Sequence, residues 1–248
     1  MQHITPTTIT CLSWNIHRGR GNDGIVDPGR TLGVLRDEVW RLGVDALFLQ
    51  EADEEALPHR GVIDVASVET VTGLRHMHMD PATRSTPESH GYRGVIAYLH
   101  PGFNIEAVRL IDLAGMCPRG AVVVDALKGA SRLRFVVTHL SLSQVLRVAQ
   151  MRTIAQHLKR FDDRQVILCG DLNEWRPWGG FALSRRILGQ AFHGPAKPTF
   201  PIKRPFLPLD RILTTAPGHV GECQVLDGPG IRMASDHRPL IARVHIAL

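Results

Sequence analysis

Acidic, amide and imidazole side chains recur in this chain directly beside short apolar segments. The residues that share this position are Asn15, Glu51, His139, Asp171 with Asn173, and the neighbours Asp236 and His237. Carboxylate and amide oxygens are hard ligands that suit Mg²⁺, or Mn²⁺ as the alternative, better than zinc. Imidazoles exchange protons near neutral pH. The set therefore predicts a site that binds a divalent cation and carries out acid–base chemistry.

Each of these residues also has a purely structural interpretation. Asn15 alone is more often a turn former, and Glu51 in Q-E-A-D-E-E could open a helix, where acidic groups complement the dipole. His139 could be a hydrogen-bonded core histidine, and G-D-L-N at 170–173 could be an ordinary Asx turn. The functional interpretation depends on all of them occurring together.

The apolar segments that precede or follow these residues have the length and β-branched content of buried strands. The predicted strands are 9–14, 46–49, 95–99, 121–127, 133–137, 165–168, 211–214 and 240–244. Strand ends of an open α/β sheet converge on the crevice where such sheets bind ligands. Polar groups spread over about 220 residues could therefore meet in one cleft.

Helical spacing of apolar residues predicts a helix over 30–42, with Gly43 as its terminator, and a second over 144–161, with Ser143 as its N-cap. A third, shorter helix is expected over 181–188. The His-rich segment 76–90 and the proline-rich segment 195–208 are predicted to be surface loops. Neither is long enough to be a linker, so residues 1–248 are expected to form a single domain.

Composition sets broad limits on the protein class. Hydrophobic residues make up 44% and charged residues 21% of 248 residues, as is ordinary for a soluble globular protein. The longest apolar run is too short to span a bilayer and no signal peptide is apparent, so we expect a cytoplasmic protein without integral membrane association. The four scattered cysteines do not predict a zinc site. A net charge of +5 favours an anionic partner, although solubility alone would also explain it.

Six motifs in order resemble those of the endonuclease/exonuclease/phosphatase superfamily, and they cover nearly the whole chain. The motifs are S-W-N-I-H-R-G at 13–19, L-Q-E-A-D at 49–53, V-T-H-L at 137–140, L-C-G-D-L-N at 168–173, L-D-R-I-L at 209–213 and S-D-H-R-P at 235–239. The short N-I-H-R-G loop is most similar to stand-alone bacterial members. The resemblance implies a four-layer α/β/β/α sandwich of two mixed β-sheets with outer helices.

The resemblance also implies a role for each residue. Asn15, Glu51 and Asp236 would hold the metal, Asp171 would orient or deprotonate the attacking water, and Asn173 would hydrogen-bond the developing phosphorane. Asp210 and His237 would form an acid–imidazole pair. His139 and Arg119 would contact the scissile phosphate. Abasic-site repair relatives carry an aspartate where this chain has His17, which argues against that specificity and against a second metal position.

The resulting hypothesis is a monomeric, Mg²⁺-dependent phosphoesterase that hydrolyses a phosphodiester, with DNA or RNA as the first substrate class. A phospholipid headgroup or a small phosphorylated metabolite is the alternative. A catalytically silent binding module would be expected to lack at least one of the essential groups, and none is missing. The sequence leaves the substrate, the choice between endo and exo action, and the metal preference open.

Overall fold

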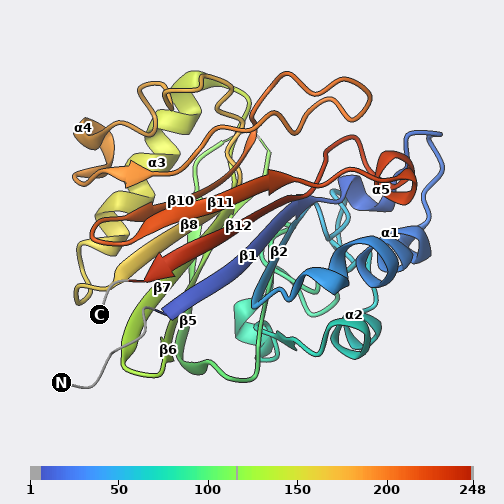
Figure 1. The fold of residues 1–248 in the computed structure, drawn as a ribbon, viewed down its shortest axis with the longest axis horizontal. Coiled ribbons are helices and arrows are strands. Elements are labelled where there is room, and N and C mark those ends of the chain that lie inside the picture. Colours follow the sequence, from blue (N-terminus) through green and yellow to red (C-terminus); the bar gives the residue numbers. More distant parts are fainter. Residues whose placement is uncertain (1–6, 116, 247–248) are drawn as a thin grey trace.

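The computed structural model describes residues 7–115 and 117–246, which form two mixed β-sheets (Figure 1). The first sheet has the strand order β11-β12-β1-β2-β4-β3, and the second has the order β5-β6-β7-β8-β10-β9. The strands are β1 (Thr7–Asn15), β2 (Ala46–Gln50), β3 (Arg75–His76), β4 (Ile96–Leu99), β5 (Asn104–Leu113), β6 (Arg119–Lys128), β7 (Ser131–His139), β8 (Gln165–Asp171), β9 (Phe192–His193), β10 (Asp210–Thr215), β11 (His219–Val225) and β12 (Leu240–Ile246).

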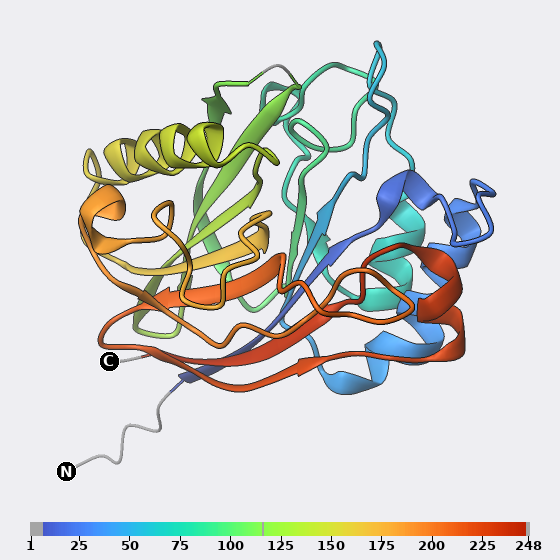
Figure 2. The ribbon, with the colours of Figure 1, turned by 90° about the horizontal axis from the view of Figure 1, so that it is seen from above.

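Three hydrophobic clusters hold the layers together. One lies between the two sheets and includes Phe48 and Phe135, whose ring centroids are 5.6 Å apart. Another joins the first sheet to the helices Pro28–Val34 (α1), Val65–Thr72 (α2) and Pro229–Ala234 (α5), and the third joins the second sheet to the helices Gln144–Leu158 (α3) and Arg185–Leu188 (α4). Helices therefore cover the outer face of each sheet (Figures 1 and 2), and the predicted four-layer sandwich is confirmed.

The helices are α1 (Pro28–Val34), α2 (Val65–Thr72), α3 (Gln144–Leu158), α4 (Arg185–Leu188) and α5 (Pro229–Ala234). Local chemistry explains where several of them begin and end. The side chains of Asp27 and Asp64 accept hydrogen bonds at the N-termini of α1 and α2. Gly73 ends α2 with a left-handed φ of 67°, a conformation that costs glycine little. None of the described helices is long and apolar enough to cross a membrane.

The predicted helices are present with changed lengths. The helix expected over 30–42 begins at Pro28 and continues beyond α1 as a π-helical turn (Leu35–Val39) and a 3₁₀ turn (Trp40–Leu42), ending at Gly43 as predicted. Helix α3 begins after Ser143, but the hydroxyl of Ser143 makes no capping hydrogen bond. The helix expected over 181–188 is reduced to the single turn α4.

The His-rich segment 76–90 is only partly a surface loop. His78 is fully buried: its Nδ1 lies 2.7 Å from the carbonyl oxygen of Thr83, and its Nε2 accepts a hydrogen bond from the backbone N–H of Ala97. These two contacts select the neutral ring with its proton on Nδ1. Burial lowers the pKa of His78 to about 4. This part of the surface prediction was wrong because backbone groups satisfy both ring nitrogens.

Candidate active site

One edge of the sandwich collects the chemically active side chains. Strands β1 and β2 are parallel, as are β7 and β8, and each of these four strands ends at this edge. Strands β10 and β12 run antiparallel to their neighbours β8 and β1 and therefore begin there. The predicted convergence of distant strand ends is what the topology produces. We call this side of the molecule the active edge.

The carboxylate of Asp171 stands at the centre of the active edge. The amide Nδ2 of Asn15 donates to its Oδ2 at 3.1 Å, and the backbone N–H of Asn173 donates to its Oδ1 at 3.0 Å. The Nε2 atoms of His139 and His237 lie 3.4 and 3.8 Å from the same Oδ2. Three different strands and the turn before β12 therefore bring polar atoms to one buried carboxylate.

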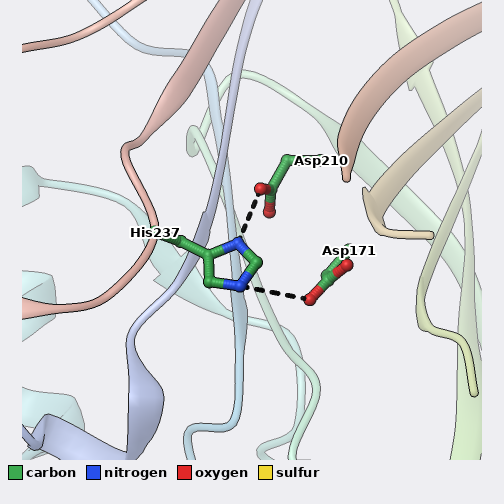
Figure 3. Close-up of side chains that lie close together, drawn as sticks. All are labelled: Asp171, Asp210 and His237. Carbon is green, nitrogen blue, oxygen red and sulfur yellow. Dashed lines mark hydrogen bonds and ion pairs between the residues drawn. The ribbon is translucent and has the colours of Figure 1, made fainter. Parts of the chain in front are cut away.

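His237 lies between two carboxylates (Figure 3). Its Nδ1 is 2.8 Å from Oδ2 of Asp210, at the start of β10, and its Nε2 faces Asp171. Asp210 is fully buried, and its Oδ2 also accepts a hydrogen bond of 2.5 Å from the hydroxyl of Thr199. The ring of Phe200 packs against His237 with centroids 4.9 Å apart. The imidazole is therefore held at one nitrogen and directed toward Asp171 at the other.

The two imidazoles of the site have opposite electrostatic environments. Burial lowers the pKa of His139 to about 3, because the nearby Asp171 only partly offsets the lost hydration of the charged ring. Burial also opposes the charged form of His237, but Asp210 and Asp171 outweigh it and raise its pKa to about 10. At neutral pH the site therefore contains a cationic His237 and a neutral His139.

Asn15 and Glu51 form a second polar group beside Asp171. Asn15 Nδ2 is 3.3 Å from Glu51 Oε1, so the same amide lies between the carboxylates of Glu51 and Asp171. The guanidinium of Arg18 donates to Glu51 Oε2 at 2.5 Å. Asp236 is 3.6 Å from Nδ1 of His17, whose backbone N–H donates to Asn15 Oδ1, so it joins this group through His17. The side-chain oxygens here are of the type that hard divalent cations prefer.

A different trio also has the spacing of metal ligands. Ligand atoms of Asp171, Asp210 and His237 lie within 4.8 Å of one another, and all three residues are buried. In this trio Asp210 Oδ2 already accepts hydrogen bonds from both His237 and Thr199. Glu51 differs from this trio in being partly exposed, with its side chain 15% accessible, and its two oxygens accept hydrogen bonds from Asn15 and Arg18.

A pocket opens next to Glu51. Its lining includes His139, Arg18, Arg93 and Arg119. Nε of Arg119 is buried and has no hydrogen-bond partner among the described residues. The lining also includes acidic residues, and Arg18 and Arg93 are paired with carboxylates, so Arg119 is the guanidinium best suited to meet a phosphate. Arg119, which the resemblance predicts to contact the phosphate, shares this pocket with His139 and Glu51.

The remaining predicted residue, Asn173, is tied to the neighbouring strand end. Its Nδ2 donates to the carbonyl oxygen of Leu140 at 2.9 Å, which links the segments after β7 and β8. Sequence reasoning missed two supporting residues. Thr199 is the second partner of Asp210, and the hydroxyl of Ser235 donates to the carbonyl of Asn15 while accepting from the backbone N–H of His237. Thr199 begins the sequence T-F-P at 199–201, and Ser235 begins the S-D-H-R-P motif.

Comparison with known proteins identifies the family of this chain. The model of the endonuclease/exonuclease/phosphatase family matches residues 12–237. The chain is 29% identical over 253 residues to the uncharacterized protein YbhP of Escherichia coli (strain K12), covering 95% of each chain.

Solved structures show the same fold. An endonuclease/exonuclease/phosphatase family protein from Bacteroides thetaiotaomicron has a TM-score of 0.75 at 16% identity, covering 98% of this chain and 100% of that one. TDP2 from D. rerio, complexed with single-strand DNA product, has a TM-score of 0.66 at 16% identity, with coverages of 96% and 99%. The family model spans most of the chain and includes every residue of the active edge described above, from Asn15 to His237. The chain belongs to the endonuclease/exonuclease/phosphatase family.

Proposed function

We propose that this protein hydrolyses phosphodiesters with the help of a divalent cation, Mg²⁺ or Mn²⁺. Family membership supports a metal-dependent phosphoesterase of nuclease-like chemistry. The observation that carries the proposal is the surroundings of Asp171, whose carboxylate is approached by Asn15, His139 and His237 beside a pocket lined with arginines. Such a site combines a base, an acid and an anion-binding surface within one cleft.

Glu51 and Asn15 would hold the cation, with Asp236 in reach through the His17 contact. A bound divalent cation supplies Lewis-acid stabilisation of the negative charge on the phosphate and on the leaving oxygen. The fit depends on oxygen donors that lie at the entrance of the pocket. The side chain of Glu51 is 15% exposed, whereas those of Asp171 and Asp210 are almost completely buried.

Side chains of the active edge carry out the proton transfer and bind the phosphate. Asp171 takes a proton from the attacking water, whose oxygen forms the new bond to phosphorus as the ester P–O bond breaks. The leaving oxygen departs with the electron pair of that bond and takes a proton from solvent water. Asn15 and the backbone N–H of Asn173 hold this carboxylate in place. The cationic His237, fixed by Asp210, donates a hydrogen bond to a phosphoryl oxygen as charge accumulates. Arg119 binds the phosphate from the pocket side.

Turnover of bis-p-nitrophenyl phosphate tests the reaction type. We expect activity with Mg²⁺ or Mn²⁺, none with EDTA, and a loss of roughly 10²–10⁴-fold in kcat for Asp171→Asn. The matched control is Asp163→Asn, an exposed acid in the loop after α3. Unchanged turnover in Asp171→Asn, or full activity in EDTA, would show that the proposal is wrong.

Nucleic acid is the first substrate class to test. The chain carries a net charge of +5, and its fold matches that of TDP2, which has been solved with a single-strand DNA product. Cleavage of labelled DNA and RNA oligonucleotides, with binding that weakens steeply as salt increases, is the expected result for this class. A phospholipid headgroup is the second class, and the exposed apolar side chains at the active edge favour it.

A further inference from the structure

The exposed apolar side chains of this protein are concentrated at one end. Twelve large apolar residues are exposed in the described chain, and all of them lie on segments that leave or enter a sheet at the active edge, although Leu42 stands at the far end of its segment, next to the start of β2. The described residues of the segment 114–118, which joins β5 to β6 at the same edge, contribute none of them. We call the apolar rim the six side chains Ile25, Leu57, Leu142, Trp178, Phe206 and Met233, which are between 43% and 80% exposed.

The rim residues stand on segments that project past the strand ends. The loop of residues 21–27 and the hairpin of residues 54–60 extend beyond the ends of β1 and β2 (Figure 2). Leu142 and Trp178 follow β7 and β8, only a few residues after His139 and Asn173. Phe206 and Met233 come before β10 and β12. The rim residues therefore stand on the same loops, at the same edge, as the residues that would carry out the reaction.

Exposed apolar residues of this size normally occur singly on a soluble protein, and their concentration at one functional edge indicates an interaction surface. Trp and aliphatic side chains at the tips of separate loops are suited to the boundary between headgroups and acyl chains of a bilayer. Lys203 and Arg204 lie beside Phe206, are exposed, and contact no acidic side chain in the described part of the chain. Together with the net charge of +5, they complement an anionic lipid surface.

Nucleic acid fits the rim less well. Single strands bind to aromatic side chains on which bases stack, whereas four of the six rim residues are aliphatic. A lipid surface, by contrast, presents phosphodiesters directly above an apolar layer, so the rim could enter that layer while the headgroup reaches Glu51 and Asp171.

We propose that the apolar rim docks the protein on an anionic phospholipid surface and that the phosphodiester it hydrolyses is a lipid headgroup. The part of this inference that concerns hydrolysis of a lipid headgroup rests on the proposed function. The docking half stands on the exposed side chains alone and can be measured without turnover.

Co-sedimentation with vesicles tests the docking. With vesicles of equal phosphatidylglycerol and phosphatidylcholine, we expect wild-type binding together with a blue shift of tryptophan fluorescence, since Trp178 is exposed in the free protein. The Leu57→Ser/Trp178→Ser double variant should lose at least about tenfold in partitioning, because burial of two apolar side chains is lost. The matched control is Leu42→Ser, which changes a residue that is 43% exposed at the opposite edge and should bind like wild type.

Three results would overturn the docking: no wild-type sedimentation, equal loss in the Leu42→Ser control, or a double variant that binds vesicles normally. Loss of oligonucleotide binding in the double variant, with vesicle binding unchanged, would assign the rim to nucleic acid instead. Turnover of bis-p-nitrophenyl phosphate in solution separates the two halves. A rim variant that keeps this turnover but loses vesicle binding supports the docking. Absent turnover in the wild type contradicts the proposed function, and vesicle binding then still decides whether the rim docks on lipid.

Discussion

Replacement of Asp210 by asparagine removes one negative charge beside His237 and leaves the hydrogen-bond geometry in place. Oδ2 of Asp210 accepts hydrogen bonds from both His237 and Thr199, whereas Oδ1 is buried and has no hydrogen-bond partner among the described residues. The amide oxygen of an asparagine can therefore replace Oδ2, and its nitrogen can take the place of Oδ1. The substitution comes close to a pure deletion of charge.

The expected effect on His237 follows from its environment. Burial alone favours the neutral ring, and the carboxylates of Asp210 and Asp171 together raise its pKa to about 10. With the nearer carboxylate neutralised, we expect the pKa to fall to or below the ordinary value of about 6.5. That change of roughly 3.5 units corresponds to a free energy on the order of 5 kcal/mol between the two protonation states.

The raised pKa of His237 also makes the stability of the folded protein depend on pH. A raised pKa in the folded protein contributes stability that is fully present below about pH 6.5 and is lost as pH rises toward 10. The free energy of unfolding of wild type should therefore exceed that of Asp210→Asn most clearly near pH 6, and this difference should shrink as pH approaches 10.

NMR titration of ¹⁵N-labelled histidine measures the pKa directly, and bis-p-nitrophenyl phosphate turnover at pH 8 measures the consequence. We expect a neutral His237 in Asp210→Asn and a kcat reduced by roughly 10²–10⁴-fold, since the site loses its acid. Asp163→Asn again serves as the control. A variant in which His237 stays protonated at pH 8, or in which kcat is unchanged, would refute the role assigned to Asp210.

Three further predictions concern charges elsewhere in the chain. Arg18→Gln should bind Mn²⁺ about tenfold more tightly by calorimetry, because the guanidinium 2.5 Å from Glu51 competes with a cation; equal or weaker binding would contradict this. Glu174→Gln should lower the free energy of unfolding in urea by about 3 kcal/mol, because it leaves the buried Arg147 without its carboxylate 3.6 Å away. Between pH 7 and pH 5 the free energy of unfolding of wild type should fall by about 2 kcal/mol because of His78 alone. The pKa of His78 is lowered to about 4, so its contribution to stability is full above about pH 6.5 and is lost as pH falls. A His78→Gln variant whose stability has the same pH slope would be inconsistent with this.

The strands that sequence reasoning found and missed differ in their place in the sheets. All eight predicted strands lie inside the sheets, and the four that were missed, β3, β5, β9 and β11, are the four edge strands. An inner strand is covered on both faces and reads as a continuous apolar run. Strand β11 (H-V-G-E-C-Q-V) is partly exposed along its whole length, so its composition is that of a loop.

The sequence by itself determined the strands of the core and the types of residue at their ends, because burial and strand spacing act locally along the chain. The fold class came from the resemblance of its motifs to a known family. Only the tertiary structure decided which of these side chains touch. Asp210 and Asp171 face each other through the register of β10 with β8, and His237 reaches both from a turn far along the chain. The opposite pKa shifts of His139 and His237, and the position of Arg18 against Glu51, follow from these long-range contacts. Electrostatic energies depend on distance and burial in space, neither of which is encoded in the spacing of residues along the sequence.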